Sequence, residues 1–167
     1  MIIVVMGVSG CGKSTIAQSL ADALGWSFQE GDALHPQANV DKMSAGMPLD
    51  DSDRWPWLDR IAAWIEDEAA HGRQGVVTCS ALKRNYRDRL RLAGAGVRFA
   101  YIHVSRDELE RRLTHRLHFM PASLLESQLQ TLEVPDENEQ AITLSGADST
   151  DAMIDEVCRL INVPRLQ

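Results

Sequence analysis

Residues 2–15 have the sequence IIVVMGVSGCGKST, which joins a short apolar run to a glycine-rich segment. The run Ile2–Met6 is continuous, largely β-branched and bounded by glycine, which is typical of a strand buried on both faces of a sheet. Residues Gly7–Ser14 match the pattern G-x-x-x-x-G-K-[ST], and apolar residues four apart from Ile16 to Leu24 predict a helix after it. A strand, a glycine-rich loop and a helix in this order predict a P-loop.

The residue types of this loop indicate its chemistry. Glycines allow successive backbone N–H groups to point at one oxyanion, and the following helix adds the positive end of its dipole. Lys13 can reach the β- and γ-phosphates of a nucleotide, Ser14 can ligate Mg²⁺, and Thr15 is expected to contact the α-phosphate. We therefore predict an ATP site, with Mg²⁺ arriving on the nucleotide, formed by Gly7, Val8, Ser9, Gly10, Cys11, Gly12, Lys13, Ser14 and Thr15.

Strands and helices are predicted to alternate along the rest of the chain. Further strands are expected at 27–30, 75–79, 97–104 and 141–144. Helices are expected at 36–45, 82–93, 106–116, 122–132 and 151–161, with a longer one that is capped by Asp53 and runs to about residue 70. This alternation favours a parallel sheet with helices on both faces. The expected fold class is α/β: a three-layer P-loop fold with a five-stranded parallel sheet and a small helical lid.

Length and composition limit the possible functions. A chain of 167 residues fits one domain, 1–167. Its net charge of −7 argues against a nucleic-acid partner, and its longest apolar run is too short to span a membrane. Three cysteines without CxxC spacing indicate free thiols and a reducing compartment, so we expect a cytoplasmic protein.

Acidic residues follow the predicted second strand. The sequence Glu30-Gly31-Asp32 lies where the carboxyl end of that strand should meet the P-loop, because parallel strands end at one edge of the sheet. An acid there can orient the hydroxyl of a phosphate acceptor and take its proton, which suits Asp32 in a small kinase. Glu30 is a candidate to hold the metal ion through a water molecule. The alternative is an acidic turn without a catalytic role.

A basic segment in the second half of the chain predicts a lid. Arg112 and Arg116 are four residues apart on one predicted helix face, and Arg116 lies within a segment at about 114–125 that we expect to be mobile. A cation delivered by a closing lid would stabilise the transferring phosphoryl group. Arg116 is the first candidate for this role and Arg112 the second. The alternative is an ordinary basic helix surface.

Three blocks of sequence resemble the gluconate kinase family. They begin with Gly31-Asp32-Ala33-Leu34-His35-Pro36, with Cys79-Ser80-Ala81-Leu82-Lys83 and with His118-Phe119-Met120, and the resemblance runs from about Ile2 to Pro135. It implies ATP:D-gluconate 6-phosphotransferase activity, a fold like that of nucleoside monophosphate and shikimate kinases, and a homodimer. The segment Arg116-Leu117-His118 lacks a glycine that is expected before the His-Phe pair, which affects the geometry of the lid.

Gluconate carries one carboxylate and several hydroxyls, so its site needs a cation and polar groups. The candidates lie in the matching blocks, within a substrate-binding segment at about 32–58 and beyond it: Asp32, His35, Lys42, Arg54, Lys83, Arg87 and Gln128. Arg54 and Arg87 are the preferred carboxylate ligands, because arginine offers a bidentate fork. Some of these cations could instead be solvated helix charges, and His35 could cap a helix. The alternative functions are a kinase of another small acceptor (idonate, shikimate or a nucleoside monophosphate) and a nucleotide-binding regulator.

Overall fold

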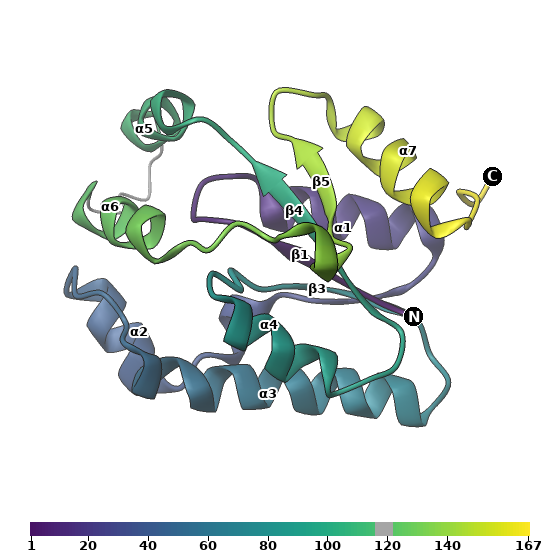
Figure 1. Cartoon of the computed structure of the whole chain (residues 1–167), viewed down its shortest axis with the longest axis horizontal. Coiled ribbons are helices and arrows are strands. Elements are labelled where there is room, and N and C mark those ends of the chain that lie inside the picture. Colours follow the sequence, from purple (N-terminus) through teal and green to yellow (C-terminus); the bar gives the residue numbers. More distant parts are fainter. Residues whose placement is uncertain (116–121) are drawn as a thin grey trace.

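The computed structural model describes residues 1–115 and 122–167 (Figure 1). Its sheet has the five strands β1 (Ile2–Met6), β2 (Ser27–Gln29), β3 (Gly75–Thr78), β4 (Val97–His103) and β5 (Ile142–Ser145). They lie in the order β2-β3-β1-β4-β5, and every neighbouring pair is parallel. The predicted five-stranded parallel sheet is therefore confirmed.

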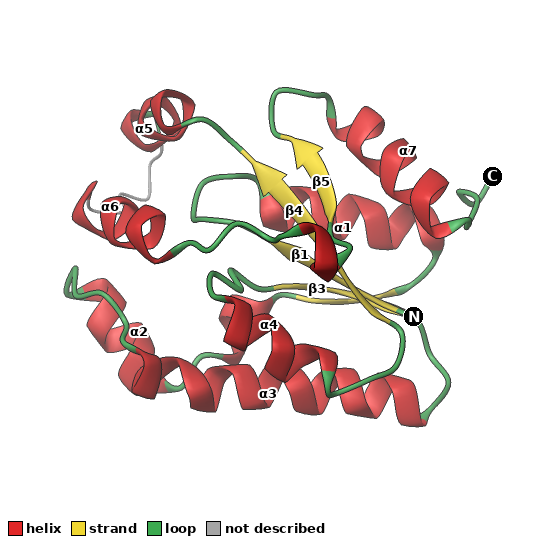
Figure 2. Cartoon of the chain, viewed as in Figure 1, coloured by secondary structure: helices red, strands yellow, loops and turns green. Residues whose placement is uncertain are grey.

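Helices cover both faces of the sheet, which gives the three expected layers (Figure 2). Helices α1 (Lys13–Leu24) and α7 (Thr150–Ile161) pack together on one face, and α3 (Asp51–Ala70) and α4 (Arg84–Arg91) pack together on the other. The remaining elements are α2 (Gln37–Ser44), α5 (Arg106–Thr114), α6 (Ala122–Thr131) and the 3₁₀ turns η1 (Gly31–Leu34) and η2 (Glu137–Glu139). Helices α2, α5 and α6 lie at the carboxyl end of the sheet.

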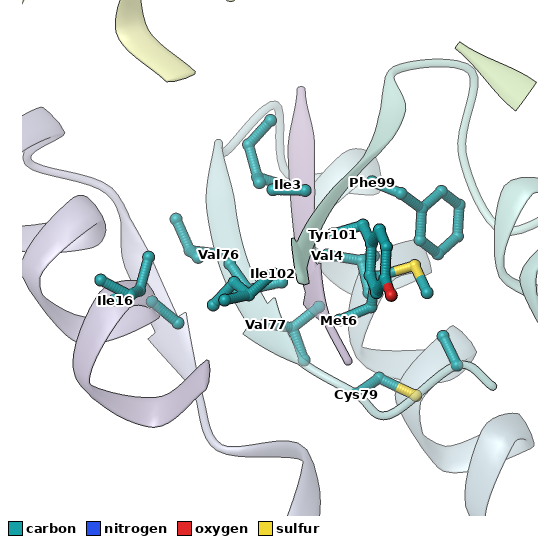
Figure 3. Close-up of a cluster of buried hydrophobic side chains, with 14 of the residues drawn as sticks. Ile3, Val4, Met6, Ile16, Val76, Val77, Cys79, Phe99, Tyr101 and Ile102 are labelled. Atoms are coloured by element: carbon teal, nitrogen blue, oxygen red, sulfur yellow. The ribbon is translucent and has the colours of Figure 1, made fainter. Parts of the chain in front are cut away.

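The hydrophobic core is continuous through the sheet (Figure 3). Every residue of β1 is buried, as expected for a strand covered on both faces. Val4 and Val77 lie side by side in the register of β1 and β3, and Ile16 of α1 covers one side of this layer. The core holds β1 rigidly, and the glycine-rich loop leaves the sheet directly from its carboxyl end.

The start of α3 differs from the prediction. Asp50, not Asp53, is the N-cap, and its carboxylate accepts a hydrogen bond of 2.9 Å from the Asp53 amide. In turn, the Asp53 carboxylate accepts a hydrogen bond of 3.0 Å from the Asp50 amide. The two acids form a capping box, which needs a hydrogen-bonding side chain at both positions. Within the described ranges, no helix is both long and apolar enough to cross a membrane.

Candidate active site

The glycine-rich loop has the backbone of an anion-binding turn. Gly10 and Gly12 adopt φ values of 86° and 98°, which residues other than glycine rarely adopt. Gly12 is also the N-cap of α1, and no side chain caps the first turn of that helix. The uncapped amides and the positive end of the 12-residue helix therefore fit an oxyanion such as a nucleotide phosphate.

Lys13 and Arg112 lie at this loop. The Lys13 ammonium donates to the carbonyl oxygens of Gly7 at 2.9 Å and Val8 at 3.0 Å. The Arg112 guanidinium donates to the carbonyl of Gly10 at 3.1 Å and to that of Gly146 at 3.2 Å. The structure thus brings one predicted lid arginine to the rim of the loop. The other, Arg116, lies outside the described residues, as does much of the predicted lid segment.

A close backbone approach fixes the position of Asp32. A Cβ atom on Gly31 would lie only 1.8 Å from the carbonyl oxygen of Thr78, so no other residue fits there. The Gly31 amide donates to the Thr78 hydroxyl at 2.8 Å, and its carbonyl accepts from the Trp57 indole at 2.8 Å. Turn η1 is thereby attached to the end of β3, and Asp32 lines the same cleft as Lys13.

The electrostatics of Asp32 suit a proton acceptor. Its side chain is 78% exposed and lies on the cleft, where protein atoms surround it on several sides. This desolvation raises the pKa of Asp32 above its ordinary value, the Lys13 ammonium lowers it in part, and the Glu30 carboxylate raises it again. Glu30 itself is half-buried and accepts a short hydrogen bond from the Thr78 hydroxyl. Asp32 is therefore the carboxylate of this pair that lines the cleft.

The cleft has a volume of about 420 Å³, within the range of small-molecule sites. One part of its lining is polar and comes from the P-loop, η1, α3 and α6: Ser9, Lys13, Asp32, His35, Arg54, Ser127 and Gln128. Another part is apolar and comes mainly from α2 and the loop after it: Val40, Met43, Met47, Pro48 and Leu49. This apolar part lies within the expected substrate-binding segment at about 32–58, but the sequence assigned no role to its side chains.

His35 is a neutral, fixed member of the lining. Its ring stacks on Trp57 with centroids 4.1 Å apart, and its Nδ1 lies 3.2 Å from the side-chain nitrogen Nδ2 of Asn39. Because that nitrogen can only donate, Nδ1 accepts and the proton of the neutral ring is assigned to Nε2. Nε2 lies 3.9 Å from the Asp32 carboxylate. Burial, together with the Arg54 charge, lowers the pKa of His35 to about 4, so the ring is uncharged at neutral pH.

The predicted substrate cations are placed very differently. Lys42 pairs with Asp53 at 2.6 Å and Lys83 pairs with Asp51 at 3.0 Å, and neither lysine lines the main cleft. Arg54 does line it, and within the described part of the chain its guanidinium makes no ion pair. Its one hydrogen bond there is to a neutral group, the Tyr86 hydroxyl, at 3.2 Å.

The structure does not bring Arg87 to the cleft. This side chain is fully buried, and its Nε and Nη2 donate to the two carboxylate oxygens of Glu139 at 2.7 and 2.9 Å. Its Nη1 donates to the carbonyls of Ala81 at 2.8 Å and Leu82 at 3.3 Å. The guanidinium is thus committed to internal partners, and the expectation that it binds a substrate carboxylate is not supported. Arg87 instead holds the loop before α4.

We expect Glu139→Gln to lower the free energy of unfolding by about 3–5 kcal/mol, because it leaves the Arg87 charge buried without its counter-ion. Burial alone would raise the pKa of Glu139, but the hydrogen bonds and charge of Arg87 lower it to about 2. A depressed pKa stabilises the fold above the ordinary value of 4.5, and this stabilisation is lost as pH falls from 4.5 through about 2. Denaturant unfolding at several pH values measures both effects.

Glu137→Gln is the matched control for this experiment. Glu137 lies in the same 3₁₀ turn and loses the same charge, but it is exposed. We expect little change in its unfolding free energy. Equal destabilisation by both variants would show that the buried pair has no special role.

Gln128 connects α6 to the P-loop. Its side-chain oxygen accepts from the Ser9 amide at 2.7 Å, and its side-chain nitrogen donates to the Ser9 hydroxyl at 3.1 Å. The sequence predicted that Gln128 contacts a substrate hydroxyl. The structure places it on the cleft, with its amide engaged by the loop.

Known proteins resemble the chain over almost its entire length. A family model described as "AAA domain" matches residues 2–135. A gluconokinase from Gluconobacter oxydans is 54% identical over 158 residues, which are 94% of this chain and 89% of that protein. A crystal structure of a gluconokinase from Sinorhizobium meliloti has 46% identity and a TM-score of 0.84, covering 96% of this chain and 93% of the other. That of a sugar kinase from Janibacter sp. has 43% identity and a TM-score of 0.92, covering 97% and 94%.

Proposed function

Because the chain belongs to the gluconokinase family of P-loop kinases, we propose that it phosphorylates D-gluconate at the 6-hydroxyl, using ATP and releasing 6-phospho-D-gluconate and ADP. The observation that supports this function best is that one cleft is lined by Ser9 and Lys13 of the P-loop, by the Asp32 carboxylate and by Arg54, which has no carboxylate partner among the described residues. The loop suits the phosphates of ATP, Asp32 suits the reacting hydroxyl of gluconate, and Arg54 suits the gluconate carboxylate.

The proposed roles follow from position and charge. Asp32 orients the 6-hydroxyl and accepts its proton as the oxygen bonds to the γ-phosphorus and the bond to ADP breaks. Arg54 holds the gluconate carboxylate, and His35 supplies an N–H for a substrate oxygen or for Asp32. Lys13 and Arg112 stabilise negative charge on the transferring phosphoryl group, a role for which Arg116 also remains a candidate. Lys42, Lys83 and Gln128 act around this site through their protein partners.

The nucleotide and its metal ion are assigned to the P-loop. Residues Gly7–Thr15 would hold the phosphates of ATP through backbone amides, and the Ser14 hydroxyl would contribute a ligand to Mg²⁺. Ser14 and Thr15 are exposed on the first turn of α1, which is compatible with this role. When bound, Mg²⁺ neutralises phosphate charge. Glu30 is a further candidate to contact it through water.

The test is ADP release from Mg·ATP with D-gluconate, L-idonate, shikimate, AMP, the neutral analogue D-gluconamide and no acceptor. We expect turnover with D-gluconate and weak turnover with D-gluconamide, because only the acid satisfies the Arg54 charge. In Arg54→Met, the KM for gluconate should rise by about 10–100-fold, since a hydrogen bond to a charged group contributes roughly 1.5–3 kcal/mol. Its preference for the acid over the amide should disappear.

Arg159→Met is the control for Arg54→Met, because Arg159 lies on α7 and pairs with the neighbouring Glu156. Turnover with a different acceptor would retain the P-loop assignment and refute the proposed substrate. ATP hydrolysis that is independent of every acceptor would instead favour a nucleotide-binding regulator.

We also propose that the protein is a cytoplasmic homodimer that binds neither nucleic acid nor membrane. The dimer is suggested by the family resemblance. A reducing compartment is supported by Cys11, Cys79 and Cys158, which are all unpaired and buried. A net charge of −7 is unfavourable for nucleic-acid binding.

A further inference from the structure

A polar network, buried at Tyr86 and partly exposed at Asp51 and Lys83, lies behind Arg54. The Tyr86 hydroxyl accepts a hydrogen bond from Arg54 and donates a short one to the Asp51 carboxylate. Lys83 donates to the same carboxylate oxygen at 3.0 Å. Tyr86 is buried, and its ring makes a T-shaped contact with that of Trp55 at a centroid distance of 5.5 Å. Of these residues only Arg54 lines the main cleft, so the network reaches the substrate site through its guanidinium.

The direction of each hydrogen bond in the network is fixed. Arginine has no acceptor atom, so the Tyr86 oxygen must accept from Arg54 and its proton must go to Asp51. Burial and the Asp51 contact both raise the pKa of Tyr86, which keeps the hydroxyl protonated at neutral pH. The hydrogen bond from Tyr86 and that from Lys83 lower the pKa of Asp51, which keeps the carboxylate charged. The arrangement therefore persists across the physiological pH range.

Tyr86 also separates two opposite charges. Asp51, Arg54 and Lys83 line one shallow hollow beside the main cleft, so Asp51 is a nearby alternative partner for the guanidinium. With the tyrosine hydroxyl between them, the Asp51 charge is compensated by Lys83, and the Arg54 charge remains available to the cleft. A direct Arg54–Asp51 pair would neutralise the cation that the cleft presents.

We propose that Tyr86 and Asp51, with Lys83 as counter-ion, are positioning residues that direct the Arg54 guanidinium into the cleft and thereby set the affinity for the carboxylate of the acceptor. This inference rests on the proposed function, because it assumes that Arg54 binds that carboxylate. It assigns to Tyr86 the role of a spacer that keeps Arg54 from pairing with Asp51.

Tyr86→Phe tests the spacer role, since it removes only the hydroxyl. We expect the KM for D-gluconate to rise about tenfold. The kcat and the KM for ATP should stay unchanged, because neither depends on the carboxylate end of the acceptor. Tyr101→Phe is the matched control: Tyr101 is also buried, but its hydroxyl faces His103 at 3.4 Å. That variant should leave both KM values unchanged.

The decisive measurement is rescue by a second substitution. If the freed guanidinium pairs with Asp51, then adding Asp51→Asn to Tyr86→Phe removes the competing charge and should recover most of the lost affinity. Lys83→Gln offers an independent variant on a partly exposed side chain. It should raise the KM by leaving the Asp51 charge uncompensated, and Asp51→Asn should rescue it too. Direct binding of substrate by Lys83 predicts no such rescue.

Other results would overturn the proposal. An unchanged KM in Tyr86→Phe, or a raised KM that Asp51→Asn does not recover, excludes the spacer role. A fall in kcat and a rise in both KM values, together with a lower melting temperature, would indicate a purely structural tyrosine. If Arg54→Met leaves the gluconate KM unchanged, the proposed carboxylate contact itself is wrong, which separates that failure from a failure of the spacer.

Discussion

Asp32→Asn should lower kcat with D-gluconate by about 10²–10⁴-fold, the usual contribution of a positioned general base. The amide preserves the size of the side chain but cannot accept the proton of the 6-hydroxyl. The Kd for ATP should change little, because Asp32 lies on the acceptor side of the P-loop, in the first turn of η1. Steady-state kinetics and equilibrium nucleotide titration measure the two quantities separately.

The pH profile provides a second test of Asp32. Desolvation raises its pKa above the ordinary 3.8, and the base works only when ionised, so turnover should increase with pH through this elevated pKa. That acidic limb should vanish from the residual activity of Asp32→Asn. Glu30→Gln is the comparison variant, since Glu30 is held by Thr78 at the neighbouring strand end. A larger loss of kcat in Glu30→Gln than in Asp32→Asn, with an unchanged requirement for Mg²⁺, would transfer the role of base to Glu30.

Lys13→Met is the second substitution with a large expected effect. It should reduce kcat by about 10²–10³-fold, the cost of removing one preorganised group that stabilises transition-state charge. Nucleotide binding should weaken less than turnover, because the backbone amides of the loop and the helix N-terminus remain. The substitution also removes the two hydrogen bonds from Lys13 to the Gly7 and Val8 carbonyls. Circular dichroism and ADP titration therefore accompany the kinetics.

Lys13→Arg separates charge from shape at the same position. It keeps a cation but replaces a compact ammonium by a wide planar guanidinium, so we expect only partial recovery of turnover. An active Lys13→Met enzyme would refute the assignment of this loop as the phosphoryl-transfer site.

Local sequence patterns were sufficient to predict the fold and the glycine-rich loop after β1. The apolar run Ile2–Met6 and the glycine spacing up to Gly12 act over a few residues, so they can be recognised without knowing what packs against them. The position of Asp32 followed from the rule that parallel strands end at one edge. Asp50 was missed as the cap of α3 because Asp53, three residues later, has the same side chain and a reciprocal role.

The acceptor side was less predictable because it depends on long-range partners. Arg54 and Arg87 are the same residue type and both lie in the family blocks. Arg87 pairs with Glu139, which is 52 positions away in the sequence, and so does not reach the cleft. Lys83 is paired with Asp51 from a segment 32 positions away. Nothing in a single sequence states which acid lies beside which base. Tyr86 lies in the second of the family blocks, but the resemblance assigned no role to its hydroxyl.

The Arg87–Glu139 pair links the rim of the cleft to the last third of the chain. On one side the guanidinium holds the Ala81 and Leu82 carbonyls, beside the cleft-lining Ser80 and Leu82. On the other it holds η2, from which the chain continues into β5 and α7. Heat that loosens the carboxyl-terminal elements will therefore disturb the substrate rim as well. A substitution in η2 can consequently alter the rim of the cleft without exchanging any side chain that lines it.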